Sequence, residues 1–195
     1  MHSAARSAET AAGQPEKSRA AAASAACAGL RHDDDRDSRS SYARSRGGRR
    51  RRLLVAGSVT YQINGGWAVD ALAGTQTRPH RDLDRFVDVT AMPDLLPWLE
   101  SRGYVITEDW GPLRVELASA TGRVDVHPMT IQSNGDGIQQ GLGDEVFVHP
   151  AVERTVGVIG GREVVVATPA RLRELRTGYE LRPVDHHDLG VRDRL

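Results

Sequence analysis

Lysine and cysteine are almost absent from this sequence of 195 residues. The one lysine, Lys17, lies near the start, so chemistry that requires a lysine, such as a P-loop or a Schiff base, cannot be placed after it. The one cysteine, Cys27, permits neither an internal disulfide nor a zinc site made of thiolates, which suits a reducing cytoplasm. No apolar run approaches the roughly 18 residues that a membrane helix requires, so we expect a cytoplasmic protein with no membrane partner.

Charge divides the chain into two unlike parts. Residues 1–52 contain eleven arginines and one lysine against six acidic residues, whereas residues 53–195 contain fourteen arginines against twenty acidic residues. Residues 1–50 are mostly Ala, Ser, Arg, Asp and Gly, so we predict a disordered tail there and one folded domain at 53–195. The arginine run at 49–52 could bind nucleic acid, but no aromatic residue interrupts it and the folded part is acidic. We therefore expect no nucleic-acid partner.

Local patterns predict an α+β fold with a mixed β-sheet and packed helices. A strand at 59–64 ends at Gly65-Gly66, and a short helix at 67–74 follows. The glycine-rich segment 133–144 is predicted to be a loop. Further strands are predicted at 82–89, 104–110, 113–119 and 123–131, and on both sides of a turn at 160–161. Further helices are predicted at 92–103 and from Thr168-Pro169, where Thr168 is the N-cap and Pro169 the first helical residue.

Two aspartates, Asp82 and Asp84, are separated by one residue in the predicted strand at 82–89. Alternation puts both side chains on one face, where their oxygens can bind one cation, and oxygen ligands favour Mg²⁺ over zinc. Taken alone, the same pattern is the ordinary solvent face of a strand. Asp125 lies on another predicted strand and faces away from its two valine neighbours, so it could complete a metal site or act as a base.

Gly65 and Gly66 offer backbone N–H groups near the start of a helix, where the helix dipole favours phosphate oxygens. Arg78 and His80 come just before the acidic pair, and they could neutralise a triphosphate or be ordinary surface polar residues. Asp70 lies in the first turns of the predicted helix, so we interpret it as a partner of the helix dipole rather than as a ligand.

The stretch GGWAVDALAGTQTRPHRDLD (65–84), followed by RVDVHP (123–128), resembles the nucleotidyltransferases that adenylylate aminoglycosides and lincosamides, a branch of the polymerase-β-like superfamily. The segment TGYELRPVDHHDL (177–189) is also similar to that branch, and the resemblance extends from about residue 53 to residue 189. It implies the nucleotidyltransferase (polymerase-β-like) fold and an enzyme that uses ATP with Mg²⁺. The implied reaction transfers AMP to a hydroxyl group of a small molecule, such as an aminoglycoside-like or lincosamide-like antibiotic, and releases pyrophosphate.

The resemblance also implies roles by position. His127 matches the family as well, and we interpret it as making a structural hydrogen bond. Catalysis and metal binding are carried over to Asp82, Asp84 and Asp125, and nucleotide binding to Gly65, Gly66, Arg78 and His80.

Two departures from the family pattern leave an alternative open. The arginine-rich tail replaces most of a helix expected before the first strand, and Arg85 stands where an aliphatic residue is usual, which would disturb packing. The alternative is a non-catalytic relative that binds a nucleotide or a partner, such as an antitoxin-like module. The run DHHD (185–188) would suit a metal-dependent phosphohydrolase, but that site requires further helical histidines, so we interpret the run as the polar start of a C-terminal helix.

Overall fold

The computed structural model describes residues 59–194, so the predicted tail at 1–50 and the predicted domain boundary at 53 lie outside the described residues. No helix within residues 59–194 is long and apolar enough to cross a membrane. The helices are α2 (Gly65–Ala73), α3 (Met92–Glu100), α4 (Pro169–Glu174) and α5 (Pro183–Arg192), with short 3₁₀ turns at Val89–Ala91 and Ala151–Glu153. The strands are β1 (Tyr61–Ile63), β2 (Leu83–Asp88), β3 (Val105–Trp110), β4 (Arg114–Ser119), β5 (Gly122–Ile131), β6 (Gly137–Gln140), β7 (Val146–His149), β8 (Arg154–Ile159) and β9 (Arg162–Ala167).

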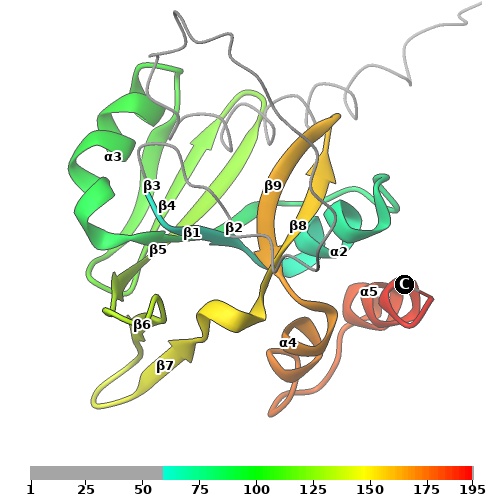
Figure 1. The fold of residues 1–195 in the computed structure, drawn as a ribbon. Helices are drawn as coiled ribbons and strands as arrows, with labels where there is room; N and C mark the ends of the chain where they lie inside the picture. Colours follow the sequence, from blue (N-terminus) through cyan, green and yellow to red (C-terminus); the bar gives the residue numbers. More distant parts are fainter. Residues whose placement is uncertain (1–58, 195) are drawn as a thin grey trace, which may run out of the picture.

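The strands form one mixed sheet, as the sequence predicts. Its main order is β3-β4-β5-β2-β1-β9-β8, and β6 and β7 extend it from the far end of β5. The β2–β5 and β1–β9 pairs are parallel, and the others are antiparallel. Helix α3 lies beside β3 and β4, whereas α2 packs on β8 and against α4 and α5 (Figure 1). The α+β architecture is therefore confirmed.

The predicted loop at 133–144 is wrong at its centre, which forms strand β6, whereas residues 133–136 and 141–144 are loops as predicted. A side chain at Gly137 would overlap the sulfur atom of Met129, so the glycine lets β6 approach β5 closely. Glycine serves close packing here rather than a turn, and its abundance misled the sequence prediction. The hairpin turning at 160–161 is confirmed, as is Thr168, whose side chain accepts a hydrogen bond from the backbone N–H of Arg171 at 3.3 Å.

Strand β2 buries alternate side chains, including one cation. Leu83 and Val87 are 1% and 0% exposed, and Arg85 between them is also 1% exposed. The guanidinium of Arg85 lies over the ring of Tyr61, 4.7 Å from its centroid. A cation–π contact therefore helps this face to accommodate Arg85, where we expected disturbed packing.

Helix α5 is attached to the rest of the domain through Asp188, whose side chain is 1% exposed. Both of its carboxylate oxygens accept hydrogen bonds from Arg78, at 2.7 and 2.8 Å, and one also accepts from Arg176 at 2.9 Å. Arg78 belongs to the loop between α2 and β2, and Arg176 to the turn after α4, so one carboxylate connects both segments to α5. The paired guanidinium geometry is among the strongest hydrogen-bonding arrangements that proteins use.

Removing the charge of Asp188 should strongly destabilise the fold. Asp188→Asn leaves the partly buried Arg78 without this counterion and leaves the buried Arg176 with Asp185 alone, 3.8 Å away. Breaking a buried ion pair in this way costs about 3–5 kcal/mol. The control is Asp144→Asn, which makes the same charge change at an exposed loop position and should leave the free energy of unfolding nearly unchanged. Urea denaturation at pH 7 measures both. Equal stability of the two variants would show that Asp188 does not hold α5 in place.

Candidate active site

The parallel pairing of β2 with β5 places Asp84 directly opposite Asp125. Residues paired across neighbouring strands point to the same face of a sheet, so the two carboxylates come together. Two residues further along β5, His127 joins them: ligand atoms of Asp84, Asp125 and His127 all lie within 4.8 Å of one another. Among residues 59–194, no other group of three or more acidic, histidine or cysteine side chains is gathered in this way.

Asp82 lies beside this group of three rather than in it. It immediately precedes β2, and its carboxylate accepts a hydrogen bond from Nε of Arg81 at 2.6 Å. Its charge is nevertheless close enough to raise the pKa of both Asp84 and Asp125. The metal-binding role of Asp82 therefore stays a prediction.

The two central carboxylates resist ionisation. Burial, followed by the charges of Asp82 and Asp125, raises the pKa of Asp84 to about 7. Burial, followed by the charges of Asp82 and Glu116, raises the pKa of Asp125 to about 6. The side chain of Asp84 keeps 34% of its surface exposed, so one edge stays open to a ligand although protein surrounds the rest. Like charges held this close are best compensated by a bound cation.

Only glycine fits at positions 65 and 66, because polar side chains lie against the backbone there. Gly65 has a φ of 64°, and a side chain on it would overlap a carboxylate oxygen of Asp84. A side chain on Gly66 would overlap the guanidinium of Arg78 and lie 2.5 Å from Nδ1 of His80. The two glycines therefore let the helix start approach the acidic pair and the loop before β2.

The first turn of α2 offers backbone N–H groups to an anion. The helix begins at Gly65, two residues earlier than the sequence predicts. Within the described residues, the side chain of Asn64 does not cap it, and its Oδ1 instead accepts a hydrogen bond from Nε2 of Gln62 at 2.8 Å. Uncapped N–H groups at a helix start attract phosphate oxygens through hydrogen bonding and the helix dipole.

Arg78 and His80 are both held by carboxylates. Arg78 is paired with Asp188, and Nε2 of the 5% exposed His80 lies 2.5 Å from Oδ2 of Asp70. Asp70 also accepts a hydrogen bond from Thr77 at 2.6 Å. The sequence interpretation of Asp70 as a dipole partner is wrong, because it is buried at the middle of α2 and fixes the following loop. Phosphate contact by Arg78 and His80 stays a prediction.

The site extends away from the acidic pair through three further side chains, Phe86, Gln139 and His149. The sequence analysis did not assign them to the site. The ring of His127 stacks on Phe86, with centroids 4.5 Å apart, and Phe86 also contacts the ring of His149. Gln139 lies between the two histidines and makes a hydrogen bond to each. The interpretation of His127 as a hydrogen-bonding residue therefore holds. Burial, followed by the charge of Arg114 for His127 and of Arg171 for His149, lowers the pKa of each ring to about 4.

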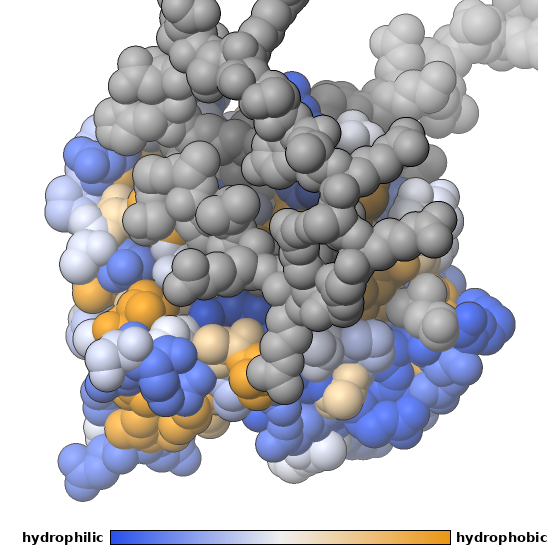
Figure 2. Space-filling view, viewed as in Figure 1, coloured by the Kyte–Doolittle hydropathy of each residue, from blue (hydrophilic) through white to orange (hydrophobic). Residues whose placement is uncertain are grey.

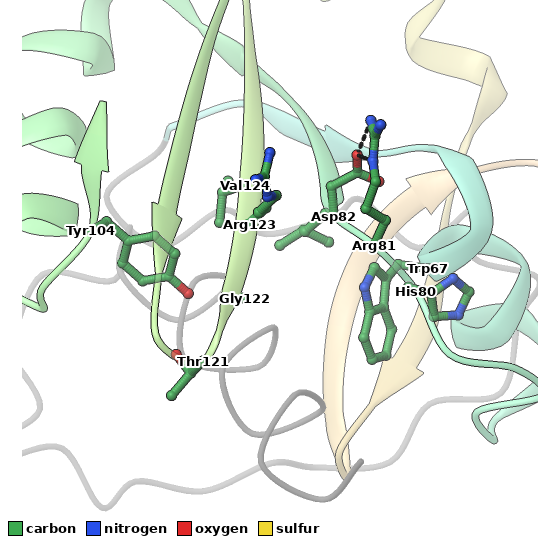
Figure 3. Close-up of a pocket in the computed structure, with 10 residues that line it drawn as sticks. Trp67, His80, Arg81, Asp82, Tyr104, Thr121, Gly122, Arg123 and Val124 are labelled. Carbon is green, nitrogen blue, oxygen red and sulfur yellow. Dashed lines mark hydrogen bonds and ion pairs between the residues drawn. The ribbon is translucent and has the colours of Figure 1, made fainter. Parts of the chain in front are cut away.

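A small cavity opens at the start of β2, lined by Trp67, Asp82, Tyr104 and Arg123 among others (Figure 3). Its volume is about 20 Å³, which is enough for a water molecule and far too small for a nucleotide. A triphosphate therefore cannot bind inside this cavity.

The run at 185–188 belongs to helix α5, as the sequence predicts. Its two aspartates bind arginines: Asp185 pairs with Arg182 at 2.8 Å, and Asp188 pairs with Arg78. Within the described residues, this run contributes to no group of three potential metal ligands. The phosphohydrolase interpretation therefore has no metal site here.

Similarity to known proteins agrees with this site. Residues 52–191 match the sequence model of the family described as aminoglycoside-2''-adenylyltransferase. A lincosamide resistance protein of Staphylococcus haemolyticus is 33% identical over 134 residues, which are 67% of this chain and 82% of that protein. The lincomycin-bound crystal structure of the lincosamide antibiotic adenylyltransferase LnuA is similar with a TM-score of 0.64 at 30% identity, over 69% of this chain and 86% of that one.

A more distant structure shares the fold. The crystal structure of ANT(2'')-Ia in complex with adenylyl-2''-tobramycin has a TM-score of 0.52 at 18% identity, over 70% of this chain and 79% of that one. The nucleotidyltransferase fold and the enzyme class expected from the sequence are confirmed. The chain belongs to the aminoglycoside-2''-adenylyltransferase family of nucleotidyltransferases.

Proposed function

We propose that this chain transfers AMP from ATP, with Mg²⁺, to a hydroxyl group of a lincosamide or aminoglycoside antibiotic. The observation that carries the proposal is the pairing of Asp84 with Asp125 beside the Gly65-Gly66 turn. Carboxylates beside uncapped helix N–H groups can bind a metal and a triphosphate at adjacent positions. We place the activity in the cytoplasm, where ATP and Mg²⁺ are supplied.

The residues of the site fit a divalent cation. Among the described residues, the buried Oδ1 of Asp125 has no hydrogen-bond partner, and Oδ2 is 3.8 Å from Arg114. Asp84 and Asp125 offer oxygen ligands, which favour Mg²⁺, and Asp82 would supply a third carboxylate. A bound Mg²⁺ would supply charge stabilisation for the triphosphate.

The protein groups would perform positioning and proton transfer. Gly65 and Gly66 would hold phosphate oxygens through their N–H groups, while Arg78 adds positive charge and His80 shapes the turn. The acceptor hydroxyl would attack the α-phosphorus, and pyrophosphate would leave as the new phosphorus–oxygen bond forms. Oδ1 of Asp125, which has no hydrogen-bond partner among the described residues, would take the hydroxyl proton.

The acceptor would lie along the β6–β7 hairpin. Its side chains Val146, Phe147 and Val148 are 51%, 45% and 44% exposed, and Figure 2 shows apolar residues gathered over this hairpin at the lower left. An exposed apolar cluster of this kind commonly marks a binding surface. Lincosamides are the first acceptors to test, because the two relatives described above at 33% and 30% identity carry that substrate class in their names.

The direct test is to incubate the purified chain with ATP, Mg²⁺ and a panel of lincosamides and aminoglycosides. Mass spectrometry should show an acceptor heavier by one AMP group, with one pyrophosphate released per product. Asp84→Asn should lower kcat/KM at least about 100-fold, which corresponds to about 2.7 kcal/mol of transition-state stabilisation. Binding of Mg-ATP without transfer to any acceptor would instead support the non-catalytic, antitoxin-like alternative.

Close approach at the glycine turn should be necessary for activity. Gly65→Ala must displace Asp84, so kcat/KM should fall at least about 10-fold. Gly74→Ala is the matched control: Gly74 also has a positive φ, of 71°, but within residues 59–194 no atom beyond its immediate chain neighbours lies within 4 Å of the added carbon. Both variants should lose about 1–2 kcal/mol of stability from backbone strain. Equal loss of activity in both would exclude a specific role for Gly65.

Ionisation of Asp84 should cost stability in the metal-free protein. The folded pKa of about 7 exceeds the unfolded value of 3.8, so the folded state binds the extra proton and this contribution weakens stability as pH rises from about 4 to 7. Asp84→Asn should therefore raise the melting temperature by a few degrees, roughly 2–5 °C, at pH 8, with no gain near pH 4. Below pH 6.5, His127 and His149 make the protein more stable as pH rises, because their pKa values are lower in the folded state. The quantity to follow is therefore the difference in melting temperature between Asp84→Asn and the wild type.

Calorimetry with and without Mg²⁺ completes this measurement. Mg²⁺ should stabilise the wild type more at pH 8 than at pH 5.5, because metal ligands must be deprotonated, and should not stabilise Asp84→Asn. The exposed Asp144→Asn carries the same charge change and should behave like the wild type. If Asp84→Asn leaves the melting temperature unchanged at pH 8, ionised Asp84 does not destabilise the metal-free protein and the prediction is wrong.

A further inference from the structure

Three polar side chains link the acidic pair to the β6–β7 hairpin without a role in the proposed reaction. Nε2 of Gln139 lies 3.4 Å from Nδ1 of His127, and Oε1 of the same amide lies 3.0 Å from Nε2 of His149. Phe86 contacts both imidazole rings, at 4.5 and 4.6 Å between centroids. One amide group therefore joins two histidines that come from different strands, β5 and β7.

We infer that Gln139 fixes His127 in the tautomer that carries its proton on Nε2, so that His127 turns an N–H group rather than a lone pair toward Asp84 and is not a metal ligand. An amide nitrogen can only donate, so Nδ1 of His127 must present a lone pair. A neutral imidazole then has its single proton on the other nitrogen. That nitrogen, Nε2, lies 4.0 Å from Oδ1 of Asp84.

His149 stabilises this orientation of the amide. Its Nε2 must donate to Oε1 of Gln139, which leaves a lone pair on Nδ1 of a side chain that is 1% exposed. Nδ1 has no hydrogen-bond partner in the part of the chain that the structure describes. The positive charges of Arg171 and Arg154 disfavour a protonated, cationic form of this ring. Turning the amide over would require both rings to exchange tautomers.

The consequence concerns which metal the site accepts, and it rests on the proposed metal site. A histidine that ligates a metal must present a lone pair, whereas Nε2 of His127 presents a proton. The group of Asp84, Asp125 and His127 would then act as an oxygen-only site, although an imidazole stands within ligand range. Oxygen ligands suit Mg²⁺, while an added imidazole would favour Zn²⁺.

The tautomer itself can be read by ¹⁵N NMR of the histidine rings in metal-free protein at pH 8. In the wild type, Nδ1 of His127 should be the unprotonated nitrogen and Nε2 the protonated one. In Gln139→Glu, a carboxylate can only accept, so both histidines should turn donors toward it and His127 should carry its proton on Nδ1. Gln140→Glu, an exposed neighbour on the same strand, is the matched control and should keep the wild-type pattern.

Zn²⁺ binding measured by calorimetry, with no nucleotide present, tests the consequence. Gln139→Glu frees the lone pair on Nε2 of His127 and should bind Zn²⁺ at least about 10-fold more tightly than the wild type or Gln140→Glu. Adding His127→Phe to Gln139→Glu should remove this gain. A proton on Nδ1 of His127 in the wild type would overturn the inference, even if Gln139→Glu fails to fold. Because the NMR measurement needs neither metal nor acceptor, it stands or falls separately from AMP transfer.

Discussion

The pairing of β2 with β5 is the contact on which the rest of the site depends. It puts Asp84 opposite Asp125, and burial together with neighbouring acidic groups makes both carboxyl groups reluctant to ionise. Two such groups are unfavourable for the fold alone and favourable for a protein that binds a cation. Binding of a cation would stabilise the folded state and offset this destabilisation, which is a common compromise between stability and function at active sites.

Buried polar contacts hold the surroundings of that pair in place. Asp70 fixes His80, and Asp188 fixes Arg78 from the other end of the chain. Both held side chains lie so near Gly66 that a Cβ atom there would overlap them, so only glycine fits at this position of α2. Charged groups that look available for a ligand in the sequence thus serve first to shape the turn, because an unpaired buried charge would cost too much.

The parts of the fold that could be predicted from the sequence are those governed by local chemistry. The alternation in β2 follows from the period of its apolar residues, and the turn at 160–161 follows from its glycines. The cap at Thr168 follows from the residue type at that position. Each of these signals lies within a few consecutive residues. Strand β6 was not predicted, because a glycine usually weakens a strand, whereas Gly137 makes room here for the side chain of Met129 on the neighbouring strand β5. Asp70 was misread because its partner, His80, is decided by the path of the following loop.

By itself, the sequence determined the chemistry available to this protein: acidic residues on strand patterns, a glycine pair at a helix start, and almost no lysine or cysteine. Only the tertiary structure decided which of these groups meet. The parallel register of β2 and β5 pairs Asp84 with Asp125, and the antiparallel pairing of β5, β6 and β7 places Gln139 between His127 and His149. Local patterns fix the direction of a side chain along its own strand, but strand pairing sets its neighbours, and pairing is a property of the whole sheet.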